Sequence, residues 1–99
     1  MAVLTLYGSI SEDGTIVNGS GNFYVKHVGS GQYQIHFNVP FSSAPAIVGS
    51  QNNFGTLDQD PRDGCVFPFV TNENAIVIVS DNAGEHCDRS FSFIAIGTI

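Results

Sequence analysis

Two polar stretches of the chain carry most of the side chains that could bind a ligand, at residues 52–64 and 81–89. The candidate ligand-binding residues there are Arg62, Asp63, Asp81, Asn82, Glu85 and His86, and Ser30 in a short glycine turn completes the set. These side chains offer the hydrogen-bond donors and acceptors that sugar hydroxyls match. Binding residues commonly lie on loops of a rigid β scaffold. Plain solvated loops have the same composition, so the residues leave both interpretations open.

The residue types and their spacing give little support for catalysis. A serine hydrolase needs a nucleophile beside a histidine that a third group holds, and no serine lies in a Gly-Xaa-Ser-Xaa-Gly motif. Cys87 lies between His86 and Asp88, which could suggest a cysteine nucleophile beside a histidine base. Adjacent residues on extended backbone point to opposite faces, so His86 cannot easily activate Cys87. His27 and His36 could be neighbours on paired strands, where ordinary hydrogen-bonded histidines are expected. We therefore predict that the protein is not an enzyme.

No cofactor and no metal are predicted. Asp58, Asp60 and Asp63 precede Gly64 and hint at a calcium loop, since hard cations prefer several oxygens within one turn. Their spacing departs from the EF-hand pattern and the closing glutamate is missing, which favours a solvated acidic loop. Neither the spacing nor the neighbours of the two cysteines suggest a zinc site, which needs about four ligands. Cys65 and Cys87 could form one disulfide or remain two reduced, partly buried thiols.

The charge of the chain argues against nucleic acid and membrane surfaces as partners. The net charge is −6, and the only basic residues besides histidine are Lys26, Arg62 and Arg89. Binding a phosphate backbone needs clustered cations, and so does binding an anionic lipid surface. Residues 1–10 contain neither a basic segment nor a long apolar run, so we expect no signal peptide and no membrane insertion. The cellular compartment stays open.

The elements that must position these loops are strands. The apolar residues are dominated by Phe, Tyr, Val and Ile, which favour strands, and no segment has a helical period. Alternation or apolar runs predict strands at 1–10, 23–28, 32–38, 46–51, 65–71, 75–79 and 90–99. The clearest hairpin joins residues 23–28 and 32–38 through Gly29-Ser30-Gly31, and Pro68 predicts an edge strand or a bulge. The sequence therefore predicts one domain, residues 1–99, with the all-β fold of an antiparallel β-sandwich of six to seven strands.

The apolar pattern also predicts a core and a covered surface. The expected core residues are Leu4, Phe23, Val25, Tyr33, Ile35, Phe37, Val48, Ile76, Ile78, Phe91 and Phe93. The strands near 75–80 and 91–97 are apolar on both faces, whereas one face of an antiparallel sandwich commonly meets water. A symmetric partner would cover the surplus apolar face. The alternative is that both strands are central and that loops cap them.

Two stretches resemble the H-type lectin domain. The first runs from Tyr33 through Phe37 and Phe41 to Pro45-Ala-Ile-Val48, and the second is Phe91-Ser-Phe-Ile-Ala-Ile96. The resemblance loosely covers residues 21–98, and receptor-binding ends of phage tail fibres show similar patterns. It implies a six-stranded sandwich that assembles as a homotrimer, sometimes paired into a hexamer, and binds galactose or N-acetylgalactosamine between protomers.

The resemblance also indicates where a sugar would bind. It aligns the sugar-contacting loop of the family with Asp81-Asn82 and a second contact with Gly29-Ser30-Gly31. Family members often have an aromatic residue followed by histidine in the first loop, and this chain has neither there. We expect an oligomeric carbohydrate-binding module whose partner is a carbohydrate or glycoconjugate. The alternative is a structural trimerisation or tail-fibre-like adhesion module without a small-molecule site.

Overall fold

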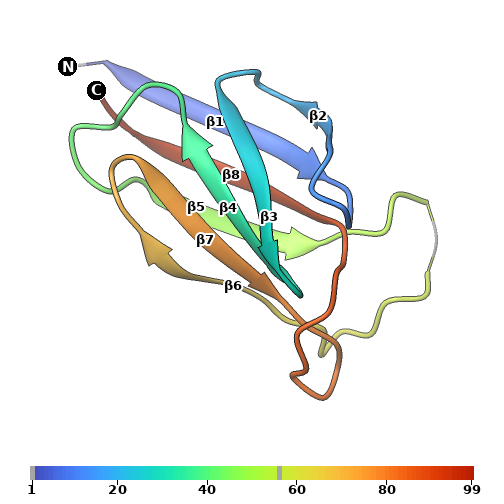
Figure 1. Cartoon of the computed structure of the whole chain (residues 1–99). Coiled ribbons are helices and arrows are strands. Elements are labelled where there is room, and N and C mark those ends of the chain that lie inside the picture. The colour runs from blue at the N-terminus through green and yellow to red at the C-terminus, as the bar shows by residue number, and fades with distance from the viewer. Residues whose placement is uncertain (1, 56) are drawn as a thin grey trace.

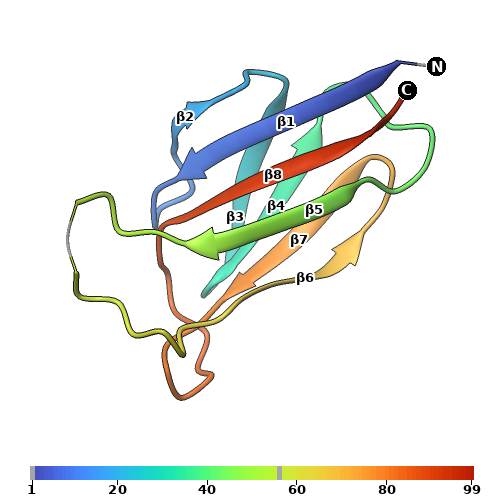
Figure 2. The ribbon, with the colours of Figure 1, turned by 180° about the vertical axis from the view of Figure 1, so that it is seen from behind.

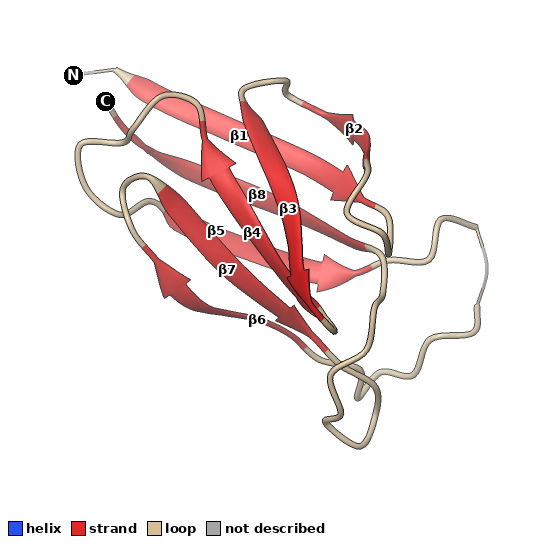
Figure 3. Ribbon diagram, in the orientation of Figure 1, coloured by secondary structure: helices blue, strands red, loops and turns tan. Residues whose placement is uncertain are grey.

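The computed structural model describes every residue except 1 and 56, and its described part contains eight strands and no helix (Figures 1 and 3). The strands are β1 (Val3–Ile10), β2 (Ile16–Gly19), β3 (Phe23–Gly29), β4 (Gln32–Phe37), β5 (Ala46–Gln51), β6 (Cys65–Val70), β7 (Asn74–Val79) and β8 (Phe91–Thr98). The predicted all-β antiparallel sandwich is confirmed. The additional strand is β2, which is short and has no buried residue, so its sequence shows no inward-facing alternation.

The strands form two four-stranded antiparallel sheets that face each other (Figure 2). The first sheet has the order β2-β1-β8-β5, and the second has the order β3-β4-β7-β6. The odd-numbered strands all end on the same side of the sandwich (Figure 1). The connections 11–15, 30–31, 52–64 and 80–90 therefore gather at one end of the molecule, which we call the loop end.

The core lies between the sheets and is built largely from aromatic side chains. Tyr33 and Phe37 of β4 are buried, as are Phe91 and Phe93 of β8. The rings of Phe23 and Phe93 meet edge to face with centroids 5.1 Å apart. Six predicted core residues are confirmed as buried: Phe23, Tyr33, Ile35, Phe37, Phe91 and Phe93. Two more, Leu4 and Val25, are partly buried against this core.

Three predicted core residues are wrong. In β7 the buried side chains are Ala75, Val77 and Val79, so Ile76 and Ile78 lie on the outer face. The strand is apolar throughout, and alternation therefore gives no signal for its direction. Val48 of β5 is 67% exposed, because the inward position next to it is Gly49, whose missing side chain makes room for the ring of Phe67.

The strand pairing also places Pro68 and the two strand histidines. β6 is an edge strand with a shift of register between Val66 and Phe69, as the proline at position 68 predicted. His27 is opposite Tyr33 and His36 is opposite Tyr24, so the two histidines are not cross-strand partners. Each instead stacks on its tyrosine, with ring centroids 4.7 Å and 4.6 Å apart, respectively.

Candidate functional site

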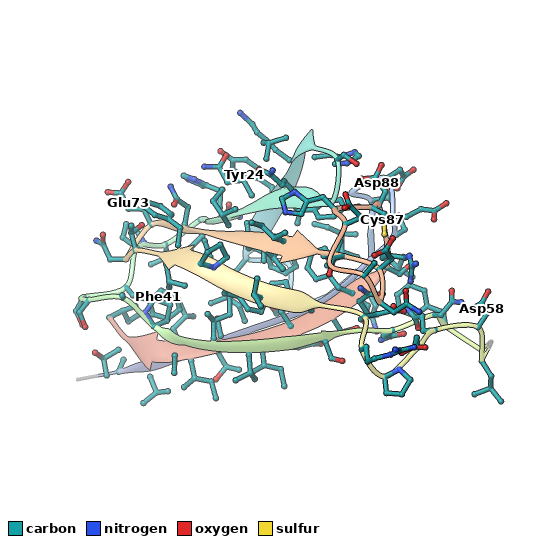
Figure 4. All side chains as sticks on the ribbon, turned by 90° about the horizontal axis from the view of Figure 1, so that it is seen from below. Tyr24, Phe41, Asp58, Glu73, Cys87 and Asp88 are labelled. Atoms are coloured by element: carbon teal, nitrogen blue, oxygen red, sulfur yellow. The ribbon has the colours of Figure 1, made fainter. Side chains whose placement is uncertain are left out.

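Charge is concentrated at the loop end. Among the described residues, ten of the twelve charged side chains are in its four connections: Glu12, Asp13, Asp58, Asp60, Arg62, Asp63, Asp81, Glu85, Asp88 and Arg89. The other two are Lys26 on β3 and Glu73 at the opposite end. Figure 4 shows Glu73 far from Asp58 and Asp88. The acidic character of the chain is therefore a property of this one end.

Asp81 shapes the connection between β7 and β8. Its backbone N–H donates to the Glu85 carbonyl at 3.0 Å, and the Gly84 N–H donates to the Asp81 carbonyl at 3.1 Å. One carboxylate oxygen of Asp81 also accepts hydrogen bonds from the N–H groups of Ala83 and Glu85, at 2.9 Å and 3.0 Å. Gly84 has a φ of 82°, as expected for the glycine of a type I turn followed by a bulge. This carboxylate oxygen therefore holds the turn.

The other predicted residues of this connection make contacts at the limit of hydrogen-bond distance. The Asn82 amide donates to Asp60 at 3.5 Å, which links the two long loops. The Ser30 hydroxyl donates to the His86 carbonyl at 3.4 Å, and a ring nitrogen of His86 lies 3.5 Å from the Gln32 amide. The structure thus brings Ser30 and His86 together. The exposed side chain of Glu85 lies further along the same turn.

Arg62 and Asp63 are neighbours in sequence that bind different partners. Arg62 is exposed and lies 3.0 Å from Asp60, and its hydrogen bond lowers the pKa of the Asp60 carboxyl to about 2. The Asp63 side chain is only 5% exposed and accepts a hydrogen bond from Arg89 at 2.8 Å. Asp63 therefore serves to hold Arg89, whereas Arg62 remains at the surface.

Gln51, at the end of β5, joins the two long loops. Its amide nitrogen donates to the carbonyl oxygens of Gly64 and Ser80, at 2.9 Å and 2.6 Å. Its amide oxygen accepts from Gln59 at 3.1 Å and from Arg89 at 3.4 Å. One glutamine thus satisfies groups from both loops, which fixes the loops relative to the first sheet.

Asp88 attaches the β7–β8 connection to the second sheet. Its carboxylate accepts a hydrogen bond from the Gly31 N–H at 2.7 Å and lies 2.8 Å from Nε2 of His27. The Gly31 N–H and, to a lesser extent, His27 lower the pKa of the Asp88 carboxyl. The ring of His27 rests on buried Tyr33, whose hydroxyl donates to the Glu12 carbonyl at 2.5 Å.

A polar cavity of about 330 Å³ opens between these connections. Its lining residues are Glu12, Asn53, Asp58, Gln59, Asp88, Arg89 and Ser90. None of the seven residues predicted from the sequence lines it, although Asp63 holds Arg89 at its wall. The lining comes from three connections far apart in sequence, and only the loop membership of these residues could have indicated it.

The lining is suited to hydrogen bonding and not to stacking. It combines three carboxylates, two amides, a guanidinium and a hydroxyl, and its described residues include no aromatic side chain. Asn53 and Asp58 are hydrogen-bonded to each other, so part of their capacity is used within the wall. Within the described ranges 2–55 and 57–99, no three His, Cys, Asp or Glu residues gather in a way that could hold a metal ion.

The cysteines lie near this end but outside the cavity. Both cysteines are free. The β7 residue Val79 lies between them: Cys65 of β6 pairs with Val79 on one side, and the Cys87 N–H donates to the Val79 carbonyl on the other side. Neighbouring strands are about 4.8 Å apart, so the two backbones are roughly 10 Å apart, beyond the span of a disulfide. Burial raises the pKa of the Cys65 thiol to about 11.

The chain matches no protein-family model, no curated protein and no solved structure. The resemblance to the H-type lectin domain therefore stays a prediction. Among the described residues, no helix is long and apolar enough to cross a membrane.

Proposed function

We propose that this chain binds carbohydrate and that one sugar unit occupies the cavity at the loop end. The observation that carries the proposal is the polar wall built from three separate connections around about 330 Å³. Small-ligand sites begin at about this size. Gln51 and the Asp63–Arg89 ion pair hold the wall in place without a ligand, which lowers the ordering cost of binding.

The chemistry of the wall favours a neutral sugar. Glu12, Asp58 and Asp88 supply carboxylates, and Arg89 is the one cation among the described lining residues. Carboxylate oxygens accept hydrogen bonds from hydroxyl groups but repel the carboxylate of an acidic sugar. Galactose or N-acetylgalactosamine, which the family resemblance implies, are neutral. With no ring to stack on the sugar, single-site affinity is expected to be low, and an oligomer would raise it through avidity.

A glycan array with the labelled native protein tests this proposal. Glu12→Gln removes one wall carboxylate, and Glu73→Gln makes the same change at the opposite end as the matched control. We expect Glu12→Gln to weaken binding at least about tenfold, as for the loss of a hydrogen bond to a charged group, and Glu73→Gln to leave it unchanged. Selective binding that neither variant alters would place the sugar elsewhere.

The predicted loop contact at Asp81 and Asn82 needs its own variant. Because the Asp81 carboxylate holds the turn, a variant at this position would change the shape of the loop as well as remove a possible contact with the sugar. Asn82→Ala leaves these turn bonds in place and is therefore the cleaner probe. Loss of binding in Asn82→Ala together with normal binding in Glu12→Gln would favour the site that the resemblance implies.

A structural module is the second candidate function. It is favoured by the outer face of the first sheet, which exposes Tyr7, Val48, Ile94 and Ile96. A trimer with no glycan signal would support a trimerisation or adhesion module without a small-molecule site. The trimeric or hexameric state that the resemblance implies is tested by the mass of the native protein.

A further inference from the structure

The first sheet contains no charged or titratable side chain other than the phenol of one tyrosine. None of its strands, β1, β2, β5 and β8, contains an Asp, Glu, Lys, Arg or His. The chain nevertheless has twelve charged residues, ten of them at the loop end. A broad surface free of charge on a protein of net charge −6 is one on which two copies can pack without burying like charges against each other.

The outer face of this sheet is largely apolar. Cross-strand pairing places Tyr7, Ile94 and Val48 in one row across β1, β8 and β5. These side chains are 49%, 47% and 67% exposed, respectively. The next row contains Ile96 between smaller residues. In Figure 4 the side chains that project from β1, β8 and β5 away from the second sheet carry few oxygen or nitrogen atoms.

The outer face of the second sheet is mixed. On its β6 edge, Val66 and Phe69 are exposed beside Ile78 and Ile76 of β7, whereas β3 and β4 present polar and charged side chains. Across β3 and β4, Tyr24 pairs with His36 and Lys26 pairs with Gln34. These polar and charged side chains are suited to water, as expected for the solvent face of an antiparallel sheet. The two outer faces therefore differ in charge, and the uncharged face of the first sheet is the one on which a second copy can pack without burying a charged side chain.

The area of this face suits a second copy. Its exposed outward residues are Val3, Thr5, Tyr7, Ala46, Val48, Ser50, Ile94 and Ile96. Their exposed fractions amount to on the order of 600 Å² per copy, so a pair would bury about 1,200 Å², the lower end of the range for specific, stable interfaces. A patch of that size lies at the upper end of the largest apolar patches on monomeric proteins, and such patches are often functional.

The face also has a protrusion and a hollow on opposite sides of β8. An open hollow of about 350 Å³ is lined by residues of β5 and β8, among them Val48, Ser50 and Ile94. The ring of Tyr7 projects from β1 on the other side of Ile94. A twofold axis parallel to β8 would place each Tyr7 over the hollow of the other copy.

We propose that a second copy of this chain packs on the outer face of β1, β8 and β5, about a twofold axis that runs along β8. Such an interface uses the same patch twice. It keeps the strands of the two sheets nearly aligned, as in other face-to-face sheet packings. The proposal concerns a different surface from the sugar cavity and stands or falls independently of it.

Light scattering on the eluting protein tests the pairing directly. We expect a mass of twice 10.5 kDa for the native chain. Tyr7→Lys buries a charge twice in each pair and should weaken the dimer by at least about 100-fold, since unpaired charges at an interface cost several kcal/mol. Tyr24→Lys changes a tyrosine of similar exposure on the second sheet and should leave the dimer intact.

Mixing two variants tests the axis. If Tyr7 lies over Val48 of the other copy, Tyr7→Lys and Val48→Glu should each be monomeric alone and should form a heterodimer when mixed. Within one chain these positions are two strands apart, roughly 10 Å, so the restored pair must form between copies. An axis across the strands would place the introduced lysine away from position 48 and would give no heterodimer.

Several outcomes would overturn the proposal. One is a native protein that stays at 10.5 kDa up to about 100 µM, well above typical dissociation constants of stable dimers. Another is a trimer whose mass Tyr7→Lys does not change, which would leave this face unused. A third is equal dissociation by Tyr7→Lys and Tyr24→Lys. Circular dichroism establishes that each variant is folded, and the mass of the native protein tests the pairing without any variant.

Discussion

Gly31→Ala should destabilise this protein far more than Gly84→Ala, although both glycines have left-handed backbones at the loop end. Their φ values are 64° and 82°, respectively. A side chain at position 84 would meet no atom within 4 Å. A Cβ at position 31 would collide with the Val79 carbonyl oxygen and would lie 2.7 Å from the Cys87 nitrogen. Only backbone movement can relieve those two contacts.

The magnitude follows from these two geometries. A left-handed residue other than glycine costs about 1–2 kcal/mol, which both variants share. Overpacking adds about 1–3 kcal/mol at position 31 alone. Displacement of Gly31 also strains its 2.7 Å hydrogen bond to Asp88, and a bond to a charged group contributes about 1.5–3 kcal/mol. We expect about 3–5 kcal/mol for Gly31→Ala and about 1–2 kcal/mol for Gly84→Ala.

Urea denaturation followed by circular dichroism measures both variants under the same conditions. The native protein is compared at equal concentration, because any dimer adds a concentration-dependent term to the stability. Equal losses of stability in the two variants would refute the close approach of the β3–β4 turn to Val79 and to the β7–β8 connection. Loss of sugar binding in Gly31→Ala with binding retained in Gly84→Ala would further connect Gly31 to the position of Asp88 in the cavity wall.

The other predictions concern the core, acid stability and thiol reactivity. Phe37→Ala should lower the free energy of unfolding, measured in denaturant melts, by about 3–5 kcal/mol because it leaves a buried site empty. Val48→Ala should lower it by less than about 0.5 kcal/mol in the monomer. Similar losses in the two variants would contradict the assignment of Phe37 to the buried face and Val48 to the outer face. Hydrogen bonds from Ser11 and Thr15 lower the pKa of the Asp13 carboxyl to about 2. The ionised carboxylate therefore stabilises the folded state fully above its ordinary pKa, and this contribution is lost as the pH falls from about 4 to 2. Asp13→Asn should therefore make the melting temperature depend less on pH over that range. A pH dependence equal to that of the native protein would show that Asp13 does not contribute. With a thiol pKa of about 11, Cys65 is on the order of 0.1% thiolate at pH 8. Because the residue is only partly buried, mass spectrometry should find that maleimide labels it slowly in the folded protein and rapidly once the chain unfolds. Equal labelling rates in the two states would contradict the raised pKa.

The strands could be predicted because their apolar residues alternate. Tyr33, Ile35 and Phe37 lie on one face of β4 in the sequence, and all three are buried in the structure. Such alternation specifies which face is buried, since a shift by one residue would expose the whole set. Pro68 likewise predicted the irregular edge strand, because proline cannot donate to the ladder.

The orientation of β7 and the existence of β2 could not be predicted in this way. Every residue from Ala75 to Val79 is apolar, and the buried set consists of the smaller residues Ala75, Val77 and Val79. They belong to the same core as the large aromatic side chains of β4 and β8, and only the packing of the whole core decides between the two orientations. β2 has no buried face at all, so no pattern marks it.

The cavity could not be predicted from the sequence for a different reason. Glu12, Asn53 and Arg89 are more than 30 residues apart from one another, and they meet because odd-numbered strands end on the same side. Loop composition pointed to two of the three connections that line the cavity. It could not show that the Asp81 carboxylate holds a turn or that Asp63 is committed to Arg89. Assigning those roles requires distances between atoms.

The proposed axis along β8 connects the two surfaces of this protein. A rotation about an axis parallel to the strands keeps both loop ends on the same side of the dimer, so two cavities would face one glycan-bearing surface. The same arrangement brings two acidic ends together, and their repulsion opposes pairing. Added salt screens such repulsion over about 10 Å at 0.1 M, so ionic strength should tighten this dimer. An axis across the strands would separate the acidic ends, and the affinity of the pair would then change little with salt.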